Sequence, residues 1–326
     1  MASPDPLVFV FNGDADGLIA QHILGLELGA PDLRVTGLKR DIDLIGKLPP
    51  LQRGRVHAMD ISLRRNLDAA LALLSQGNVH ITWYDHHDPG QPPERADLEL
   101  HINQAPETCT AVIVNAVRGL RHPLWAAMAA FGDNLPATAS ALASTVGASS
   151  HEAALLRRVG VLLNYNAYGE KPGDTLFPPA DLAERMAPFK EALEFCWDAS
   201  ILAPLAAQFE SDRDRCEGLT PLSERPGAAA YLLPDEPFAR RYGATWANER
   251  VLQNPGEALA VIHGGGNGTY RISIRAPRTG GAVPSAFALA KEFPTGGGRK
   301  LAAGIDALPA DELERFTDRF GEFFGR

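Results

Sequence analysis

The sequence of 326 residues predicts an α/β fold: an N-terminal, doubly wound parallel sheet, then helices, then a smaller C-terminal α/β domain across a cleft. Three observations carry this prediction. Strand-like apolar runs alternate with helix-like runs in the first part of the chain. A long stretch of helical periodicity follows from Thr108. Strand-like and helix-like runs then mix again after residues 218–227, which hold two prolines and two glycines.

The turn-rich segment at 218–227 is therefore expected to link two domains, because the chain is longer than a usual single domain. The first domain would occupy residues 1–217 and the second residues 228–326.

Each element is expected from the period of its apolar residues and from the turn residues that bound it. The first domain is expected to contain strand 7–11, helix 18–28, strands 33–38 and 56–59, helix 65–75 and strand 79–84. The helical part that follows is expected at 111–117, 123–132, 137–146, 152–165, 181–197 and 204–217. The second domain is expected to contain strand 228–233, helix 238–252, strands 258–262 and 269–276 around a hairpin loop at 264–268, helix 283–293, a glycine-rich loop at 296–298 and a last helix from about 310 to 324.

The composition is typical of a soluble globular protein, with 45% hydrophobic and 22% charged residues. No apolar run approaches the roughly 20 residues of a membrane helix, and the N-terminus lacks the layout of a signal peptide. We therefore expect a cytoplasmic protein that does not bind a membrane. The three cysteines, Cys109, Cys196 and Cys216, are scattered, which favours neither a disulfide framework nor a zinc site.

The formal net charge of −9 bears on the partner. Proteins that track long nucleic acids carry a basic stripe, because phosphate neutralisation supplies most of their affinity. No such stripe is evident here, so a long duplex is not expected as a partner. A small phosphorylated ligand held by a few arginines and a metal remains compatible with this charge. The sequence leaves the oligomeric state open, a homodimer included.

Carboxylates and histidines follow three of the expected strands and one of the expected helices. They are Asp14 and Asp16 after strand 7–11, Asp60 after strand 56–59, Asp85-His86-His87 after strand 79–84, and Asp133 after helix 123–132. The carboxyl ends of parallel strands form the ligand crevice of an open α/β sheet, so these groups are expected to converge. Each motif alone is weak, because Asp-Gly pairs are common in turns and a His-His pair is usually on the surface. Three acidic placements after three strands make coincidence the weaker explanation.

Mixed carboxylate and imidazole ligands suit manganese or magnesium rather than a thiol-loving ion. Two aspartates spaced i, i+2 can point to different ions, while Asp60 could bridge them. Two divalent ions a few ångströms apart can activate water and hold a phosphoryl group during in-line displacement. The sequence thus predicts a centre for Mn²⁺, with one ion or two, and Mg²⁺ as the alternative ion.

Four motifs in order resemble those of the DHH phosphoesterases, and a C-terminal motif resembles the Gly-Gly-Gly-His-x-x-Ala-Ala-Gly signature of the domain associated with them. The four are Phe11-Asn12-Gly13-Asp14-Ala15-Asp16-Gly17, Met59-Asp60-Ile61-Ser62, Tyr84-Asp85-His86-His87 and Gly132-Asp133-Asn134, and the C-terminal motif is Gly296-Gly297-Gly298-Arg299-Lys300-Leu301-Ala302-Ala303-Gly304. The resemblance spans nearly the whole chain. It implies a metal-binding catalytic domain at 1–217 and a substrate-binding domain at 228–326.

The resemblance also implies roles for the motif residues. His87 would face the scissile phosphate, as a general acid or as a hydrogen-bond donor to developing charge. Asp85 would orient the histidine pair. The implied manganese ligands are Asp14, Asp16, Asp60, His86 and Asp133.

Three positions depart from the family pattern. Many members have a histidine four residues before the first Asp of the Asp-x-Asp pair, where this chain has Val10. Others have a ligand two residues before it, where this chain has Asn12, a weaker donor that could bind metal or line the site. Both changes predict a first metal site that is looser, or filled only when substrate is present. Arg299 replaces the usual histidine, which keeps phosphate binding but removes proton transfer.

The C-terminal domain is expected to bind the substrate. Arg275 matches an arginine that contacts a substrate phosphate in the family, although a solvated strand face is about as good an explanation. The backbone amides of Gly296, Gly297 and Gly298 could approach a nucleotide phosphate closely, beside Arg299.

The predicted function is a manganese-dependent phosphodiesterase that hydrolyses very short oligonucleotides or linear dinucleotides to mononucleotides by metal-activated water. The acidity and compact size of the chain favour this short-substrate end of the family. The alternative within the class is a single-strand-specific, RecJ-like exonuclease. An alternative of another class is a metal-impaired nucleotide-binding or scaffold protein, for which Val10 and Arg299 are the sequence evidence. A pyrophosphatase shares the N-terminal motifs, but the C-terminal signature argues against it.

Overall fold

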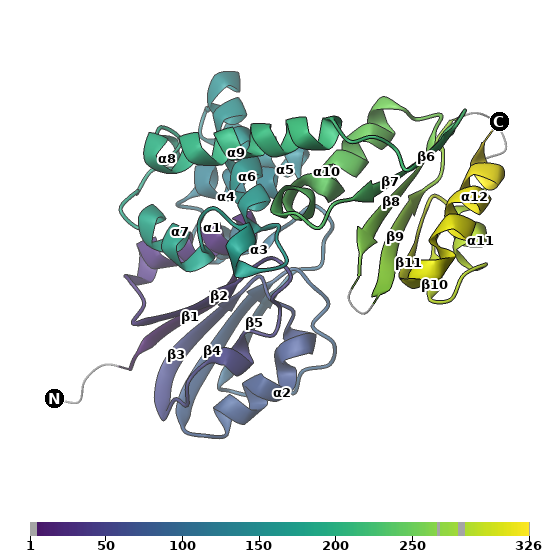
Figure 1. Ribbon diagram of the computed structural model, residues 1–326. Helices are drawn as coiled ribbons and strands as arrows, with labels where there is room; N and C mark the ends of the chain where they lie inside the picture. Colours follow the sequence, from purple (N-terminus) through teal and green to yellow (C-terminus); the bar gives the residue numbers. More distant parts are fainter. Residues whose placement is uncertain (1–4, 266–267, 280–283, 326) are drawn as a thin grey trace. The chain divides into compact units, whose positions relative to one another are not determined.

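The computed structural model describes residues 5–265, 268–279 and 284–325, which form two compact units (Figure 1). Unit 1 comprises Met1–Phe209 and unit 2 comprises Glu210–Arg326. This division falls inside helix α9 (Ala199–Glu217), whereas the predicted boundary at 217/218 coincides with the end of that helix. The predicted linker, 218–227, contains strand β6 (Ser223–Arg225), which pairs with the sheet of unit 2.

Unit 1 contains the predicted parallel sheet. Its strands lie in the order β2-β1-β3-β4-β5, and every neighbouring pair is parallel. The strands are β1 (Leu7–Asn12), β2 (Leu33–Gly37), β3 (Arg53–Met59), β4 (Asn78–Asp85) and β5 (Leu98–Ile102). Strand β5 was not predicted, because Glu99 and His101 interrupt its short apolar run.

Both faces of this sheet are covered by other elements. Since alternate side chains of a strand point to opposite faces, each strand contributes residues to two cores. In β1, Phe9 and Phe11 belong to the core that includes α1 (Ala15–Leu28) and the helical layer. Val8 and Val10 belong instead to the core beneath α2 (Leu63–Leu74). The near-continuous apolar sequence of β1 follows from this burial on both faces.

The helical layer consists of α3 (Thr110–Val117), α4 (Pro123–Gly132), α5 (Pro136–Thr145), α6 (Ser150–Ala167), α7 (Pro179–Met186), α8 (Ala192–Phe195) and α9. The single helix predicted at 181–197 is wrong, because the chain forms the two helices α7 and α8 there. Pro188 explains the break, since proline has no amide hydrogen to donate within a helix and its ring clashes with the carbonyl four residues before it. In the part of the chain that the structure describes, no helix is long and apolar enough to cross a membrane.

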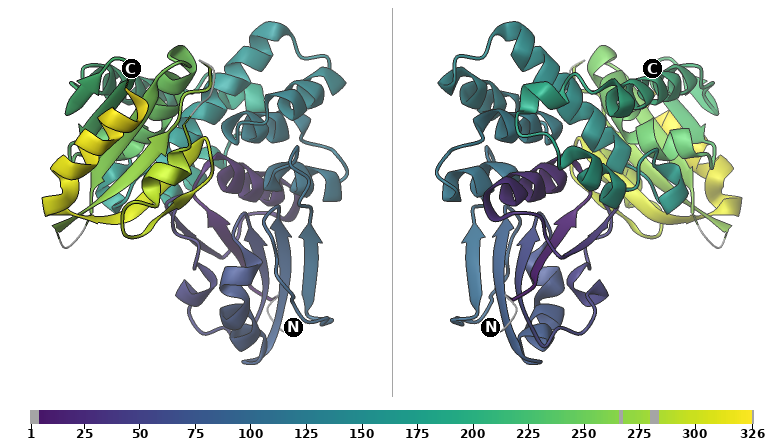
Figure 2. Two further views of the ribbon diagram at one scale, coloured as in Figure 1. Left: turned by 90° about the vertical axis from the view of Figure 1, so that its right-hand side faces the viewer. Right: turned by 90° about the vertical axis from the view of Figure 1, so that its left-hand side faces the viewer.

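Unit 2 contains a mixed sheet whose described strands lie in the order β10-β11-β9-β8-β7-β6. Its remaining elements are β7 (Ala228–Leu233), α10 (Pro237–Gln253), β8 (Ala258–Gly264), β9 (Thr269–Arg275), α11 (Ala286–Ala290), β10 (Gly296–Gly298), β11 (Ala302–Pro309) and α12 (Leu313–Phe324). Helices α11 and α12 pack on one face of this sheet (Figure 2). Phe316 and Phe320 of α12 belong to the core between these helices and the sheet. Tyr231 of β7 contacts Trp246 of α10 with ring centroids 4.9 Å apart.

The structure of unit 2 differs from two of the predictions made from the sequence. The glycine-rich segment expected as a loop is instead the edge strand β10, which pairs antiparallel with β11. Helix α11 begins after Ser285, whose hydroxyl accepts a hydrogen bond from the amide of Ala288. The first residue of the predicted helix, Val283, and residues 266–267 of the predicted hairpin loop lie outside the described residues.

His22 of α1 gives a testable pH dependence of stability. Its Nε2 donates a hydrogen bond to the carbonyl of Phe189 at 2.9 Å, and the centroid of its ring lies 4.3 Å from that of the Trp125 ring. Burial lowers the pKa of His22 to about 4 despite this hydrogen bond. The unfolded chain therefore binds one more proton than the folded chain between pH ~6.5 and ~4. As pH falls through that window, we expect the free energy of unfolding to decrease by up to about 3 kcal/mol from this residue.

The measurement is urea unfolding of wild type and His22→Phe across that range. Phenylalanine keeps the aromatic contact but cannot titrate, so the difference between the two free energies should slope with pH. Parallel curves would contradict this account of His22.

Candidate metal centre

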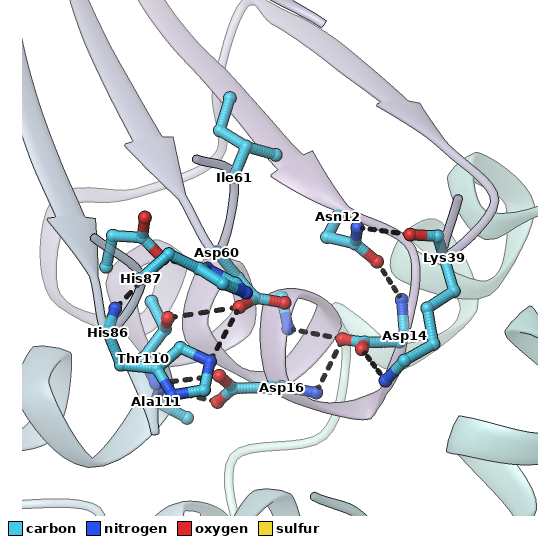
Figure 3. Close-up of polar contacts among 12 residues, drawn as sticks. Asn12, Asp14, Asp16, Lys39, Asp60, Ile61, His86, His87, Thr110 and Ala111 are labelled. Carbon is cyan, nitrogen blue, oxygen red and sulfur yellow. Dashed lines mark hydrogen bonds and ion pairs between the residues drawn. The ribbon is translucent and has the colours of Figure 1, made fainter. Parts of the chain in front are cut away.

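The carboxyl ends of β1, β3 and β4 meet at a cavity of about 420 Å³ in unit 1 (Figure 3). The lining residues are Asn12, Asp14, Lys39, Ile42, Asp60, Ser62, His86, His87 and Asp133. The parallel sheet explains this convergence, because all its strands end at the same edge. The motif residues that the sequence placed at strand ends are therefore neighbours in space.

Asp14 begins helix α1. Its Oδ1 accepts hydrogen bonds from the amides of Asp16 and Gly17, each at 3.1 Å. Gly17 permits the tight turn from β1, since a Cβ atom there would lie 2.2 Å from the carbonyl oxygen of Asn12. The other oxygen, Oδ2, contacts Nζ of Lys39 at 2.5 Å. Burial raises the pKa of Asp14, but the charge and hydrogen bond of Lys39 outweigh it and hold the pKa below the ordinary value.

Asp16 binds the N-terminus of helix α3. Its two carboxylate oxygens accept hydrogen bonds from the amides of Thr110 and Ala111, each at 2.7 Å. The side chain of Cys109, at the N-cap position, makes no capping bond, so Asp16 satisfies amides that would otherwise lack an acceptor. These two bonds fix the orientation of the Asp16 carboxylate, and each oxygen keeps a lone pair for another partner.

Asp60 has a backbone conformation that is rare for an aspartate, with φ of 56°. Its amide bonds to the carbonyl of Tyr84 at 3.1 Å, which holds this turn in place. The carboxylate accepts a hydrogen bond from Thr110 Oγ1 at 3.3 Å and lies 3.5 Å from His86 Nε2. Strained conformations of this kind cluster at functional sites. Burial, and then the charges of the neighbouring aspartates, raise the pKa of Asp60 well above its ordinary range.

Asp85 holds both histidines of the motif. It is fully buried, and its Oδ1 accepts hydrogen bonds from the amide of His86 at 2.9 Å and from Nδ1 of His87 at 2.7 Å. Because Nδ1 of His87 is occupied, Nε2 is the ring nitrogen that remains for the cavity. The hydrogen bond to Asp85 raises the pKa of His87 against the opposing effect of burial. The second oxygen of Asp85, Oδ2, is buried and has no hydrogen-bond partner among the described residues.

Asp133 reaches the cavity from the C-terminus of α4. Helix α4 approaches its neighbours closely at Gly132, where a Cβ atom would lie 2.5 Å from Cβ of Ala15. At Gly160 of α6, a Cβ atom would lie 2.2 Å from the carbonyl oxygen of Met128 in α4. These contacts hold the end of α4 beside the start of α1. Burial and the charges of Asp16 and Asp14 raise the pKa of Asp133 to about 6.

These residues fit a divalent ion. Asp16, His86 and Asp133 each offer a ligand atom within 4.8 Å of the others. A second group with the same spacing consists of Asp60, Asp85, His86 and His87. The raised pKa values of Asp60 and Asp133 show that buried negative charge here lacks full compensation, and the unpartnered oxygen of Asp85 agrees. Oxygen and imidazole donors suit Mn²⁺ or Mg²⁺.

Lys39 is a charged residue of the cavity that was not predicted from the sequence, and Ile42 and Ser62 also line the cavity without having been predicted as site residues. Lys39 lies just after β2, at the same sheet edge as the aspartates, so the strand-end rule would have found it. Nζ donates to Asp14 and also to Asn164 Oδ1 at 3.2 Å. Burial lowers the pKa of Lys39, but the Asp14 carboxylate outweighs burial and raises the pKa above the ordinary value.

Asn12 lines the cavity, but both ends of its amide are used by the backbone. Its Oδ1 accepts a hydrogen bond from the amide of Asp14 at 3.1 Å, and Nδ2 donates to the carbonyl of Lys39 at 3.1 Å. Asn12 thus holds Asp14 and Lys39 in place.

The candidate substrate-binding residues of the C-terminal domain lie close together within unit 2. Arg275 pairs with Ala302 of β11, and Gly298 pairs with Ala303, the next residue along that strand. The Arg275 guanidinium donates to Ser273 Oγ at 2.6 Å, and burial followed by the nearby charge of Arg278 lowers its pKa. Gly298 has φ of 133°, which allows the sharp turn into the exposed Arg299.

Comparison with known proteins finds no matching family model and no matching curated protein. Solved structures do match. A manganese-bound RecJ exonuclease aligns over 97% of this chain and 89% of its own, with 17% identity and a TM-score of 0.57. RecJ of Thermus thermophilus in complex with Mn²⁺ aligns over 97% of this chain, with 18% identity and a TM-score of 0.58. The alignment covers about half (51%) of that protein.

A pGpG-specific phosphodiesterase, PggH from Vibrio cholerae, aligns over 98% of this chain and 100% of its own, with 11% identity and a TM-score of 0.52. At these identities the matches establish the fold. The fold class predicted from the sequence is confirmed: this chain has the fold of the RecJ exonucleases and of a pGpG phosphodiesterase.

Proposed function

We propose that this protein is a DHH-type phosphodiesterase that hydrolyses very short oligonucleotides or linear dinucleotides, with Mn²⁺ as its ion. One observation carries the proposal: the possible metal ligands and the His87–Asp85 pair line or border a single cavity at the carboxyl edge of the sheet. The fold shared with RecJ and with a pGpG phosphodiesterase supports it.

Different residues of the cavity would have different roles in the reaction. The ion would be held by Asp16, Asp60, His86 and Asp133. When bound, a divalent ion activates water and offsets the charge of a phosphate. His87 would donate a proton or a hydrogen bond to the phosphodiester through Nε2, because its Nδ1 is bonded to Asp85. Asp85 would keep the imidazole in this orientation and favour its protonated form.

Two properties favour a short substrate. The net charge of −9 opposes binding of a long polyanion. The cavity of about 420 Å³ is within the range of small-ligand sites, which span roughly 300–1,000 Å³. We further propose that Arg275, Arg299 and the glycine strand β10 bind a phosphate of the substrate, since Arg275 and Gly298 oppose neighbouring residues of β11 in unit 2. The amide of Gly296 already donates to the carbonyl of Phe293 at 3.2 Å, so the amides proposed for the phosphate are those of Gly297 and Gly298.

The test is hydrolysis of a 5′-phosphorylated series from dinucleotide to twenty-mer, with Mn²⁺ and then with chelator. We expect cleavage that chelator abolishes and that is fastest on the dinucleotide. Chelator-resistant cleavage, or a preference for the longest strand, would contradict the proposal.

The second candidate is a single-strand exonuclease, which the alignment with RecJ over 89% of that chain favours. It predicts ordered products from a long labelled strand and a steep loss of rate with added salt. No cleavage at any length would instead support a binding or scaffold role.

A further inference from the structure

The Lys39 ammonium lies where a two-ion centre would need positive charge beside Asp14. We propose that Lys39 replaces one of the two metal ions, so that this chain binds a single divalent ion through Asp16, Asp60, His86 and Asp133. The inference rests on the proposed function for its choice of ion, but it concerns the number of ions and the groups that exclude a second one.

Lys39 is fixed by contacts at both its backbone and its side chain. Its amide donates to the carbonyl of Ala167 at 3.2 Å, and its carbonyl accepts from Asn12 Nδ2 at 3.1 Å. Nζ bonds to Asp14 Oδ2 at 2.5 Å and to Asn164 Oδ1 at 3.2 Å, and lies 5.5 Å from the ring centroid of Tyr168. Only 33% of the side chain is exposed. A lysine held in this way acts as a fixed positive charge, unlike a solvated surface lysine, which samples many rotamers.

The charge of Asp14 is therefore balanced by a cation without a metal, so an ion at Oδ2 would have to lie against the Lys39 ammonium. Its Oδ1 accepts two helix amides and its Oδ2 accepts the Lys39 ammonium. Neither group of closely spaced ligand atoms includes Asp14. In the close-up, Lys39 and Asp14 lie on one side of the Asp60 carboxylate, and His86 and His87 lie on the other (Figure 3). The donors that fit an ion thus gather around His86, away from Lys39.

The positions that could supply further ligands beside Asp14 are also changed. Val10 is fully buried in the core beneath α2 and has no donor atom. Asn12 uses its amide oxygen for the Asp14 amide and its nitrogen for Lys39. A second ion beside Asp14 would have to displace the ammonium and then find its ligands among these residues. Val10, Asn12 and Lys39 thus describe one subsite, in which an ammonium is held and neither neighbouring side chain offers a free donor atom to an ion.

The replacement keeps a cation next to the reaction site. An ammonium has three protons, and the described residues accept two of them. The third remains for a phosphate oxygen of the substrate. A lysine delivers one unit of charge where an ion would deliver two, and it needs no free metal to do so.

The test counts bound ions in the chelator-treated full-length protein, by equilibrium dialysis against Mn²⁺ with metal analysis and by EPR of the bound Mn²⁺. For wild type we expect one ion per chain and the spectrum of an isolated ion. Lys39→Ala is expected to bind a second ion and to give an exchange-coupled spectrum, since ions in two-metal sites lie about 3.5–4 Å apart. Lys39→Arg should keep one ion. Lys47→Ala removes the same charge from an exposed position and should also keep one ion.

Two coupled ions in wild type would overturn the proposal, and so would a single ion in a folded Lys39→Ala at saturating Mn²⁺. If Lys39→Ala does not fold, the wild-type count alone decides. Hydrolysis is assayed on the same samples to separate the two ideas. Two ions with hydrolysis would reject only the role of Lys39, whereas one ion without hydrolysis would reject only the proposed function.

Discussion

Asp60→Asn is expected to lower kcat by about 10³-fold or more while making the metal-free protein more stable. The loss of rate follows from removing the charge of a carboxylate beside His86, because a metal ion supplies several kcal/mol of transition-state stabilisation and 1.36 kcal/mol is tenfold in rate. Asparagine is the appropriate replacement. It keeps the size of the side chain and adopts positive φ readily, so the backbone at 56° is retained.

The gain in stability follows from the pKa of Asp60. Burial and the charges of Asp14, Asp16 and Asp85 raise this pKa in the folded state, so ionising the carboxyl costs stability as pH rises above the ordinary carboxyl range. Asparagine has no proton to lose. At neutral pH without metal we therefore expect the variant to melt at a higher temperature than wild type. The gain should vanish as pH is lowered toward ~4.

The measurement compares thermal unfolding with chelator and with Mn²⁺, alongside kcat on a dinucleotide. Mn²⁺ should raise the melting temperature of wild type and have little effect on Asp60→Asn, because a ligand stabilises only the state that binds it. Asp68→Asn, on the exposed face of α2, is the matched control and should leave both quantities unchanged. A metal-free Asp60→Asn less stable than wild type would show that Asp60 is structural.

Sequence reasoning located much of the candidate site because one rule covers it. Asp14, Asp60 and His86 follow strands of a parallel sheet, and the carboxyl ends of such strands must lie at one edge. The rule needs only the positions of the strands, which the apolar runs supply. Lys39 obeys the same rule after β2, but an ammonium is not a metal ligand, so the prediction of a metal centre did not include it.

Other features depend on tertiary packing and leave no local signal. The amides of Thr110 and Ala111 bond to Asp16 only because the start of α3 packs against α1. Asn164, which holds Lys39, lies on α6, far along the sequence from β2. The positive φ of Asp60 is likewise set by the turn that bonds its amide to Tyr84. The break between α7 and α8 does have a local signal, because Pro188 could have predicted it from the sequence.

His87→Ala is expected to lower kcat by about 10²–10⁴-fold, which is the usual contribution of a general acid to the rate. We expect little change in Mn²⁺ affinity. The geometry gives the reason. Asp85 accepts a hydrogen bond from Nδ1 at 2.7 Å and raises the pKa of His87, so Nε2 faces the cavity from a ring biased toward its protonated form. Asp85→Asn should cost about 10–100-fold, since it keeps the acceptor oxygen but removes the charge that orients and protonates the ring.

Mn²⁺ binding separates this role from metal ligation, because Asp85 and His87 also belong to a group of closely spaced ligand atoms. If either residue ligated the ion, its substitution would weaken Mn²⁺ binding in proportion to the loss of rate. His80→Ala is the matched control, since His80 is an exposed histidine on the same strand β4. It should change neither binding nor rate.

A change of leaving group then distinguishes the two ways in which His87 can act. A general acid protonates the departing oxygen, so its loss matters little for a p-nitrophenyl phosphodiester, whose leaving group departs without a proton. We therefore expect the deficit of His87→Ala to shrink on that substrate relative to a dinucleotide. A hydrogen-bond donor to the charged phosphate oxygens would be missed equally by both substrates. Equal deficits would thus assign His87 to charge stabilisation, and the Nε2 proton would stay on the imidazole throughout the reaction.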